Sequence, residues 1–452
     1  MSLDLLQFYR ACNPSKPIDM SASEREKYYI DFSAVRSRNI IDELQANITL
    51  FSPNTATCQL FAGHIGCGKS TELLYLKSIL EDAGFYVVYF EASQLLDLAD
   101  VDIGEILLAI ATYLSQHFPP AIAPEATGIW QSLLREIWKV FNREFQLGSM
   151  PHSVQIATET LQKENQHPSL SSELRTISTY AKHSPELRWK LRQYLEPRLN
   201  LILQAINTEV IEPAMIDLQQ QGYKGLVTIV DNLDRLEAIE KPWGRLQTEY
   251  LFVDRAEQLC KLNCHMVYAI PLTLIFSTEF GRLVQRFGSD PKVLPAIPVR
   301  DRRGQIFPPG IDLLQQMVLA RAFPDVARER RLERLPQVFD NAQPLERLCY
   351  ISGGHPRNLL RLLHRWIEKE RQLPLSRNVL EVAIRERCHQ LLLSLSEPEK
   401  DLLRRVADRQ RISPTENSQL LLHNLFVFEY QDEDGSWFDL NPILLEAPAF
   451  AR

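Results

Sequence analysis

The sequence lacks a hydrophobic run long enough to cross a membrane. Its longest nearly uncharged apolar stretch, MVYAIPLTLIF at 266–276, is shorter than the roughly 20 residues that a spanning helix needs, and it contains Pro271. We interpret this stretch as a buried strand that continues into a loop. A secretory signal pattern is also missing from the start of the chain. We therefore expect a cytoplasmic protein without a membrane partner.

Cysteine is sparse and scattered, since the 7 cysteines among 452 residues occur singly. This spacing suits a reducing compartment and not a disulfide framework. Cys260, Cys264 and His265 lie close together in the sequence, but no second ligand group accompanies them, so buried thiols are favoured over a zinc site. Internal repeats and long blocks of like charge are missing as well. The length and a composition of 45% hydrophobic and 24% charged residues indicate two or three globular domains.

The stretch FAGHIGCGKSTELLYL at 61–76 fits the pattern G-x-x-x-x-G-K-[ST]. It follows an apolar run and precedes a helical pattern, which is the context that a phosphate-binding loop requires. Glycines let successive backbone N–H groups turn toward phosphate oxygens, assisted by the positive end of the following helix. The predicted phosphate-binding residues are Gly63, His64, Ile65, Gly66, Cys67, Gly68, Lys69, Ser70 and Thr71.

Four side chains in two motifs are expected to carry the chemistry. Lys69 would reach the β and γ phosphates, and the Ser70 hydroxyl would hold Mg²⁺. The apolar run in GLVTIVDNLDRLE at 225–237 predicts a strand that is buried on both faces and ends at Asp231, a second Mg²⁺ residue. Asp234 would polarise or orient the attacking water. Its alternative role is a helix cap or a turn-stabilising aspartate.

The strings GHIGCGKST and IVDNLDRL resemble the STAND class of P-loop ATPases, relatives of the AAA+ proteins, and the second is similar to the D-x-L-D-R form of KAP-type members. The resemblance implies a switch that is closed with ADP and assembles with ATP. A guanine-recognition pattern [NT]-K-x-D is absent, which favours ATP over GTP. KAP proteins often have membrane spans between the two motifs, whereas this chain has polar, helix-patterned sequence there.

The same resemblance suggests further site residues. KYYIDFSAVRSRNIIDEL at 27–44 stands where such ATPases place a segment that packs on adenine, so Tyr28, Tyr29 and Arg36 are candidates, with plain packing as the alternative. NCHMVYAIP at 263–271 is similar in position to the strand that carries a polar sensor residue in AAA+ proteins. No residue within it stands out as the sensor, so Thr273, just after it, is the candidate.

Two arginines complete the candidate site. LVQRFGSDPKVLPAIPV at 283–299 resembles the segment that supplies an arginine finger to a neighbouring subunit, and Arg286 occupies the matching place. CYISGGHPRNLLRLLHRW at 349–366 resembles a lid motif, with Arg357 as the sensor that touches the nucleotide. For both arginines, a solvated surface position is the alternative.

The segment between the two nucleotide motifs is expected to be a helical insertion. It contains three helical patterns, with kinks near Pro197 and Pro213. GSMPHSVQIATETLQKENQHPSLSS looks like a mobile connector. We expect an insertion of this size to provide a surface for partners or for self-assembly.

The predicted fold class is α/β: a P-loop NTPase core with a parallel sheet, a large helical insertion, a helical lid and a C-terminal winged helix. The winged helix rests on two helical patterns and on a hairpin in LFVFEYQDEDGSWFDL, with Asp434 and Gly435 at the turn. The expected domains are an N-terminal segment at 1–50, the core at 51–300 with its insertion at about 101–222, the lid at 301–395 and the winged helix at 396–452.

Charge bears on whether the protein binds nucleic acid. Residues 412–452 contain one basic and seven acidic residues, a net charge of −6, which disfavours phosphate contact. Residues 300–411 contain 22 basic and 15 acidic residues, a net charge of +7. We favour a basic lid that pairs with the acidic C-terminus or with a neighbouring subunit.

These patterns predict a slowly hydrolysing ATP switch that forms homo-oligomers with ATP and signals to a protein partner. The alternative is a DNA-binding AAA+ ATPase of the initiator, loader or transposition-regulator type. A third hypothesis is a non-catalytic scaffold with bound nucleotide, because Asn232 stands where many AAA+ enzymes have a catalytic glutamate.

Overall fold

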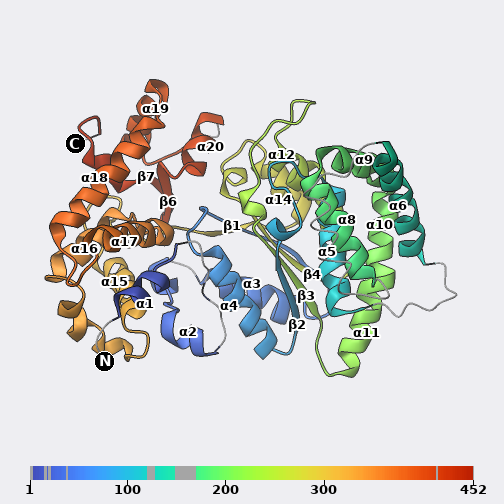
Figure 1. Ribbon diagram of the computed structural model, residues 1–452, viewed down its shortest axis with the longest axis horizontal. Helices are drawn as coiled ribbons and strands as arrows, with labels where there is room; N and C mark the ends of the chain where they lie inside the picture. Colours follow the sequence, from blue (N-terminus) through green and yellow to red (C-terminus); the bar gives the residue numbers. More distant parts are fainter. Residues whose placement is uncertain are drawn as a thin grey trace.

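A five-stranded parallel sheet forms the centre of the computed structural model, which describes residues 4–14, 18, 22–36, 39–119, 128–147, 169–413 and 416–450. The strand order is β2-β3-β4-β1-β5 (Figure 1). The strands are β1 (Cys58–Gly63), β2 (Tyr86–Glu91), β3 (Leu226–Asp231), β4 (His265–Pro271) and β5 (Lys292–Leu294).

Both faces of the sheet are covered by helices, as the continuous apolar runs predict. In β3 every residue is buried, and neighbouring side chains point to opposite layers. Ile229 packs with α3 (Ile40–Ala46) and α4 (Lys69–Asp82), whereas Val230 belongs to the larger core that includes α5 (Ile103–His117).

The parallel register brings the two nucleotide motifs to one edge of the sheet. Gly63 at the end of β1 is in register with Pro271 at the end of β4, and Asp231 at the end of β3 is in register with Glu91 of β2. Because β4 alone separates β1 from β3, the loop that follows Gly63 lies close to Asp231.

The helical insertion lies beside the sheet on the side opposite the lid (Figure 1). Pro197 falls in a 3₁₀ turn between two helices, and Pro213 lies in the first turn of the last helix, directly after a π-helical segment. Regular α-helix is therefore interrupted near both prolines, where kinks were expected. After α5, the described helices of the insertion are α6 (Ile129–Leu147), α8 (Leu170–His183), α9 (Pro185–Leu195), α10 (Leu199–Ile206) and α11 (Glu212–Gln220).

The prediction of a mobile connector was wrong at its C-terminal end. Ser169 caps α8 by accepting a hydrogen bond from the Ser172 backbone N–H, and the following residues are helical. Leu174 and Ile177 of α8 are buried in the core that includes α5, so burial of an apolar face stabilises this helix. The remainder of the expected connector lies outside the described residues.

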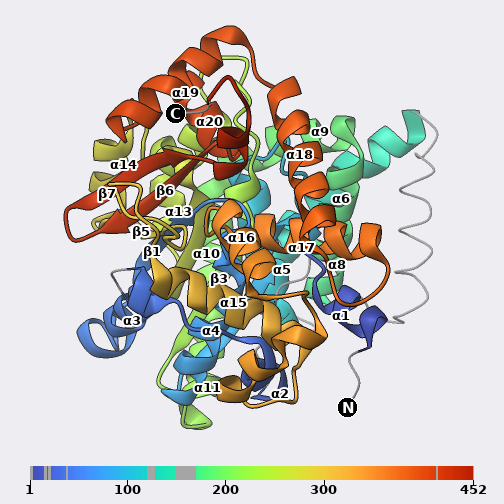
Figure 2. The ribbon, with the colours of Figure 1, turned by 90° about the vertical axis from the view of Figure 1, so that its left-hand side faces the viewer.

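Helices of the lid face the viewer in Figure 2, together with the C-terminal unit above them. The lid contains α15 (Pro308–Ala322), α16 (Ala342–Ile351), α17 (Pro356–Glu370) and α18 (Arg377–Leu393). The N-terminal helices α1 (Leu5–Ala11) and α2 (Ala22–Tyr28) pack on α15. The exact domain boundaries stay a prediction.

The C-terminal unit has the predicted order of two helices and a hairpin. One detail of the prediction was wrong: Asp432 pairs with Gly435, so the turn residues are Glu433 and Asp434. Gly435 begins the second strand with a φ of 101°, which favours glycine. The elements are α19 (Glu397–Arg409), α20 (Glu416–His423), β6 (Val427–Asp432) and β7 (Gly435–Leu440).

Three shorter helices connect the strands of the core: α12 (Gln247–Glu249), α13 (Ala256–Cys260) and α14 (Phe280–Phe287). Within the described part of the chain, no helix combines the length and the apolar character that a membrane span requires.

Candidate nucleotide-binding site

The loop between β1 and α4 has the backbone that the glycine pattern predicts. Gly66 and Gly68 adopt φ values of 92° and 107°, which side chains of L residues rarely allow. A Cβ added to Gly66 would lie 2.7 Å from Nε of Arg357 in the lid, so a close approach also requires glycine there. Gly68 directly precedes α4.

Lys69 is buried at the start of α4 and is held by three oxygen atoms. Its Nζ donates to the carbonyl oxygens of Gly63 at 2.7 Å and His64 at 2.8 Å, and it forms an ion pair with Asp234 at 2.9 Å. Burial opposes its charged form, but Asp234, together with Cys67 and Asp231, outweighs burial, so the pKa of Lys69 is raised. The structure thus brings Lys69 of the first motif and Asp234 of the second into direct contact.

Asp231 is buried at the end of β3 within a set of hydrogen-bond donors. The Tyr89 hydroxyl donates to its carboxylate at 2.7 Å, and so does the backbone N–H of Asn232 at 2.7 Å. The Ser70 hydroxyl also hydrogen-bonds to this carboxyl and lowers its pKa, whereas burial and the charge of Asp234 raise it, with a net increase. Ser70 and Asp231, the two predicted metal residues, are thus adjacent.

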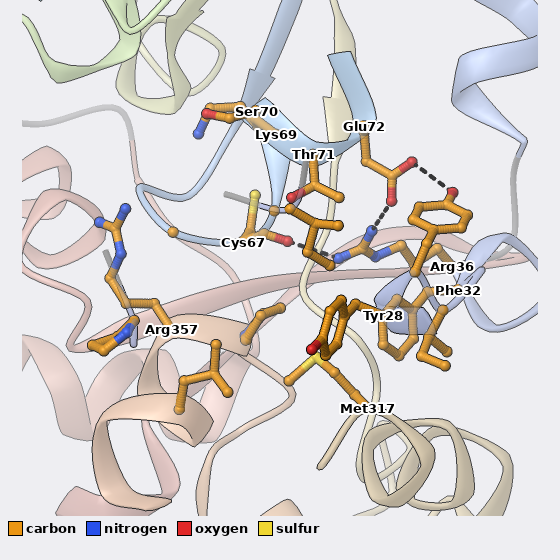
Figure 3. A pocket seen from close by; sticks show the side chains of 18 of the residues that line it. Tyr28, Phe32, Arg36, Cys67, Lys69, Ser70, Thr71, Glu72, Met317 and Arg357 are labelled. Carbon is orange, nitrogen blue, oxygen red and sulfur yellow. Dashed lines mark hydrogen bonds and ion pairs between the residues drawn. The ribbon is translucent and has the colours of Figure 1, made fainter. Parts of the chain in front are cut away.

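A cavity extends from the phosphate loop to the lid and is lined by polar and apolar residues. Six of the predicted loop residues line it, from Gly66 to Thr71. At the opposite end Tyr28, Phe32 and Met317 present aromatic and apolar surface, as Figure 3 shows. Sequence reasoning proposed Tyr28 but missed Phe32 and Met317.

Arg36 and Tyr29 were the other candidates for contact with the base. Both bond to residues of the phosphate loop and of the helix that follows it. Arg36 donates through Nη2 to the Cys67 carbonyl oxygen at 2.9 Å and forms an ion pair with Glu72 at 3.5 Å. The Tyr29 hydroxyl donates to Glu72 at 3.2 Å. Both residues line the cavity, but their polar groups are directed at the protein.

Arg357 connects the lid to the phosphate loop. Its backbone N–H donates to the Gly66 carbonyl oxygen at 3.2 Å, and its side chain packs directly against that glycine. Burial lowers its pKa, and the nearby positive charge of Arg235 adds to this effect. The lid arginine therefore lies where the resemblance placed it.

Arg286 and Thr273 are not brought to this cavity, because neither belongs to its lining. Arg286 lies exposed near the end of α14 and lines a separate hollow with Glu257 and Cys260. Thr273 is buried in the 3₁₀ turn that follows β4.

The first part of the phosphate loop faces the C-terminal unit, a contact that sequence reasoning missed. Nε2 of His64 accepts a hydrogen bond from the backbone N–H of Glu429 in β6 at 2.8 Å. The Ile65 carbonyl oxygen accepts from Nε2 of His355 at 3.1 Å. Phe428 stacks on the His355 ring with centroids 5.2 Å apart. The lid and the hairpin thus both bond to residues that were predicted to hold phosphate.

Burial shifts the pKa values of Glu429 and His64, the two residues of this contact. The pKa of Glu429 is raised to about 8, because burial outweighs the hydrogen bond from Ser436, and burial lowers the pKa of His64 to about 3. Since Glu429 is protonated in the folded protein and ionised in the unfolded chain, the free energy of unfolding should fall as pH rises from about 4.5 to about 8.

Replacing Glu429 with glutamine tests this pH dependence. Thermal unfolding of the variant and the parent should coincide near about pH 5 and diverge on the order of 1 kcal/mol per pH unit up to about pH 8, with Glu429→Gln more stable. His64 is present in both proteins, so its effect cancels in the comparison. Parallel curves at every pH would contradict the raised pKa.

Among the described residues, no group of three potential metal ligands occurs, including at Cys260, Cys264 and His265. Cys264 contacts the Thr228 hydroxyl at 3.7 Å, whereas His265 bonds to the Thr57 hydroxyl at 2.9 Å.

No protein-family model and no curated protein sequence matches the chain. Among solved structures it is similar to ORC2 of Aeropyrum pernix in ADPNP and ADP complexes, with 14% identity, coverage of 97% of this chain and 94% of that chain, and a TM-score of 0.42. Thermotoga maritima RuvB T158V is 12% identical, with coverage of 95% of this chain and 95% of that chain and a TM-score of 0.35. Aeropyrum pernix ORC1 in complex with DNA is 13% identical, with coverage of 98% of this chain and 97% of that chain and a TM-score of 0.36. At these scores and identities, the likeness carries no argument about activity.

Proposed function

We propose that the chain is an ATP-binding, slowly hydrolysing P-loop ATPase of the STAND and AAA+ kind that acts as a nucleotide-controlled switch. The observation that supports the proposal most strongly is the convergence of charged and polar groups at one end of the cavity, with aromatic and apolar surface at the other end. The converging residues are Lys69, Ser70, Asp231, Asp234 and Arg357. A nucleoside triphosphate has the matching division into a charged and an apolar part.

The residues fit the expected roles. Lys69 and the loop amides would hold the phosphates, and Asp234 would orient the attacking water once a phosphate competes for Lys69. Ser70 and Asp231 supply the hard oxygen ligands that Mg²⁺ prefers, and the buried carboxylate gains from a cation beside it. Bound Mg²⁺ would neutralise charge on the phosphates.

The switch hypothesis rests on the bonds that the lid and the C-terminal hairpin make to the phosphate loop. His355 and the backbone of Arg357 bond to the loop from the lid, and the backbone of Glu429 bonds to it from the hairpin. A change in the loop on nucleotide exchange would therefore act on both units. Assembly into homo-oligomers, a cytoplasmic location and a protein partner at the helical insertion remain parts of the same proposal.

Light scattering tests the switch. The molar mass should rise with a slowly hydrolysed ATP analogue and not with ADP. The Arg286→Ala variant should lose this assembly if Arg286 reaches a neighbouring subunit. An unchanged monomer in both states would contradict an assembly switch in the isolated protein.

A DNA-acting AAA+ ATPase is the second candidate, favoured by exposed arginines in the lid such as Arg328 and Arg330. The acidic hairpin argues against DNA contact on its own side, because its carboxylates repel phosphate and two of them already pair with arginines at the junction of core and lid. Arg300 pairs with Asp439 at 2.6 Å, and Arg302 pairs with Asp432 at 2.5 Å. A salt-sensitive gel shift that is lost when the lid arginines are replaced would support this candidate.

The non-catalytic scaffold is the third candidate. Asn232, which stands where a catalytic glutamate is common in AAA+ enzymes, is buried and donates to the Ser93 hydroxyl at 3.3 Å. Turnover of ATP that is lost in Asp234→Asn would exclude the scaffold.

A further inference from the structure

Arg235 follows Asp234 in a short turn that opens onto the phosphate end of the cavity. β3 ends at Asp231, and Asn232 adopts a φ of 68°, which redirects the chain into the 3₁₀ turn Leu233–Arg235. The buried Leu233 anchors this turn in the core. The turn directs Asp234 at Lys69, whereas Arg235 is exposed and lines the cavity.

The electrostatic neighbours of Arg235 locate its charge near the phosphate-binding groups. Its positive charge lowers the pKa of Arg357, second to burial, and it opposes the rise in the pKa of Tyr89, the tyrosine that bonds to Asp231. The charge of Arg235 therefore lies close to both the lid arginine and Tyr89, and its side chain lines the same cavity as Arg357.

Neither Arg235 nor Arg357 forms an ion pair or a side-chain hydrogen bond with another residue in the described part of the chain. These two guanidinium groups repel each other beside a loop whose amides already favour anions, while the nearby Asp234 carboxylate is paired with Lys69. Each guanidinium can donate two parallel hydrogen bonds to phosphate oxygens. A multiply charged anion is the ligand that relieves this repulsion.

We propose that Arg235 is the arginine that contacts the terminal phosphate of the bound nucleotide, supplied by the same chain that carries the phosphate loop. The inference rests on the proposed ATPase function. In the reaction, a water oxygen bonds to the γ phosphorus, and the bond to the bridging oxygen breaks. ADP leaves with the electron pair, and the water proton passes to phosphate or solvent. Arg235 stabilises the charge that develops on the transferred group.

Arg235 would act on the nucleotide of its own chain, whereas an arginine finger in trans acts on the nucleotide of a neighbouring subunit. Arg286 lies outside the cavity, so it would act only on a neighbouring subunit. An arginine in cis makes hydrolysis a property of the single chain. The specific activity should therefore stay constant when the protein is diluted until it is monomeric.

Kinetics of three variants test the inference. Arg235→Ala should lower kcat by about 10³-fold, the lower range for arginine fingers, while the Kd for ATP changes by less than about tenfold. Arg235→Lys keeps the positive charge but lacks the paired N–H donors of the guanidinium group, so it should recover only part of kcat. The matched surface control Arg404→Ala should keep the parental kcat.

Trapping of ADP with aluminium fluoride adds a readout that a structural role would not move. Arg235→Ala should bind ATP yet fail to trap the complex, whereas the parent traps it. Parental kcat and trapping in Arg235→Ala would overturn the inference. A parent that binds ATP but neither hydrolyses nor traps would overturn it as well. Absence of ATP binding by the parent would instead overturn the proposed function.

Discussion

Replacing Lys69 with alanine is expected to weaken ATP binding by about a hundredfold or more and to abolish ATP-dependent assembly. Lys69 is only 4% exposed, and its ammonium group bonds to the Gly63 carbonyl oxygen inside the phosphate loop. The substitution also leaves the Asp234 carboxylate buried without its partner, which should cost about 3–5 kcal/mol of stability. Titration with a fluorescent ATP analogue and thermal unfolding measure the two effects.

Two further variants separate binding from stability. Lys69→Ala with Asp234→Ala removes both members of the ion pair, so it should regain stability without regaining ATP affinity. Lys77→Ala, in the same helix but paired with Glu81 at the surface, should bind ATP normally. Parental ATP affinity in Lys69→Ala would refute the assignment of the phosphate loop.

Replacing Phe428 with alanine is expected to reduce the free energy of unfolding by about 3–5 kcal/mol. The ring is fully buried, stacks on His355 and meets the His64 ring edge-on at 5.6 Å. Its position also explains Gly353, where an added Cβ would lie 2.6 Å from the phenyl ring. Because the ring supports the hairpin against the phosphate loop, ATP affinity should fall together with stability.

Chemical denaturation and ATP titration measure this effect, with Phe51→Ala as the control, since Phe51 is 74% exposed. A milder Phe428→Leu should give a smaller loss of both quantities if the alanine variant does not fold. Unchanged stability and affinity in both Phe428 variants would show that the hairpin docks without influence on the loop.

The sequence predicted the phosphate end of the site because its determinants are local. Gly63 to Ser70 form one strand–loop–helix unit, and the apolar run before Asp231 reveals a buried strand. Parallel pairing with β4 then brings the two motifs together. Arg235 lay within the motif that carried the resemblance, but only the turn geometry shows that it faces the cavity.

The rest depended on contacts between residues far apart in the chain. His64 and Glu429 are 365 positions apart, and nothing in either segment indicates the other. The apolar end of the cavity likewise combines Phe32 from the N-terminal segment with Met317 from the lid. The sequence analysis also failed to predict helix α8, although its determinants are local. The spacing of Leu174, Ile177 and Ala181 indicates an amphipathic helix despite the polar sequence before it.

Calorimetric titration of the parental protein with ATP in the presence of Mg²⁺ tests the central claim most directly. The account predicts saturable binding at one site per chain, weaker binding without Mg²⁺, and tighter binding of ATP than of GTP. No saturable binding of either nucleotide would contradict the claim that the cavity between the phosphate loop and the lid is a nucleotide site.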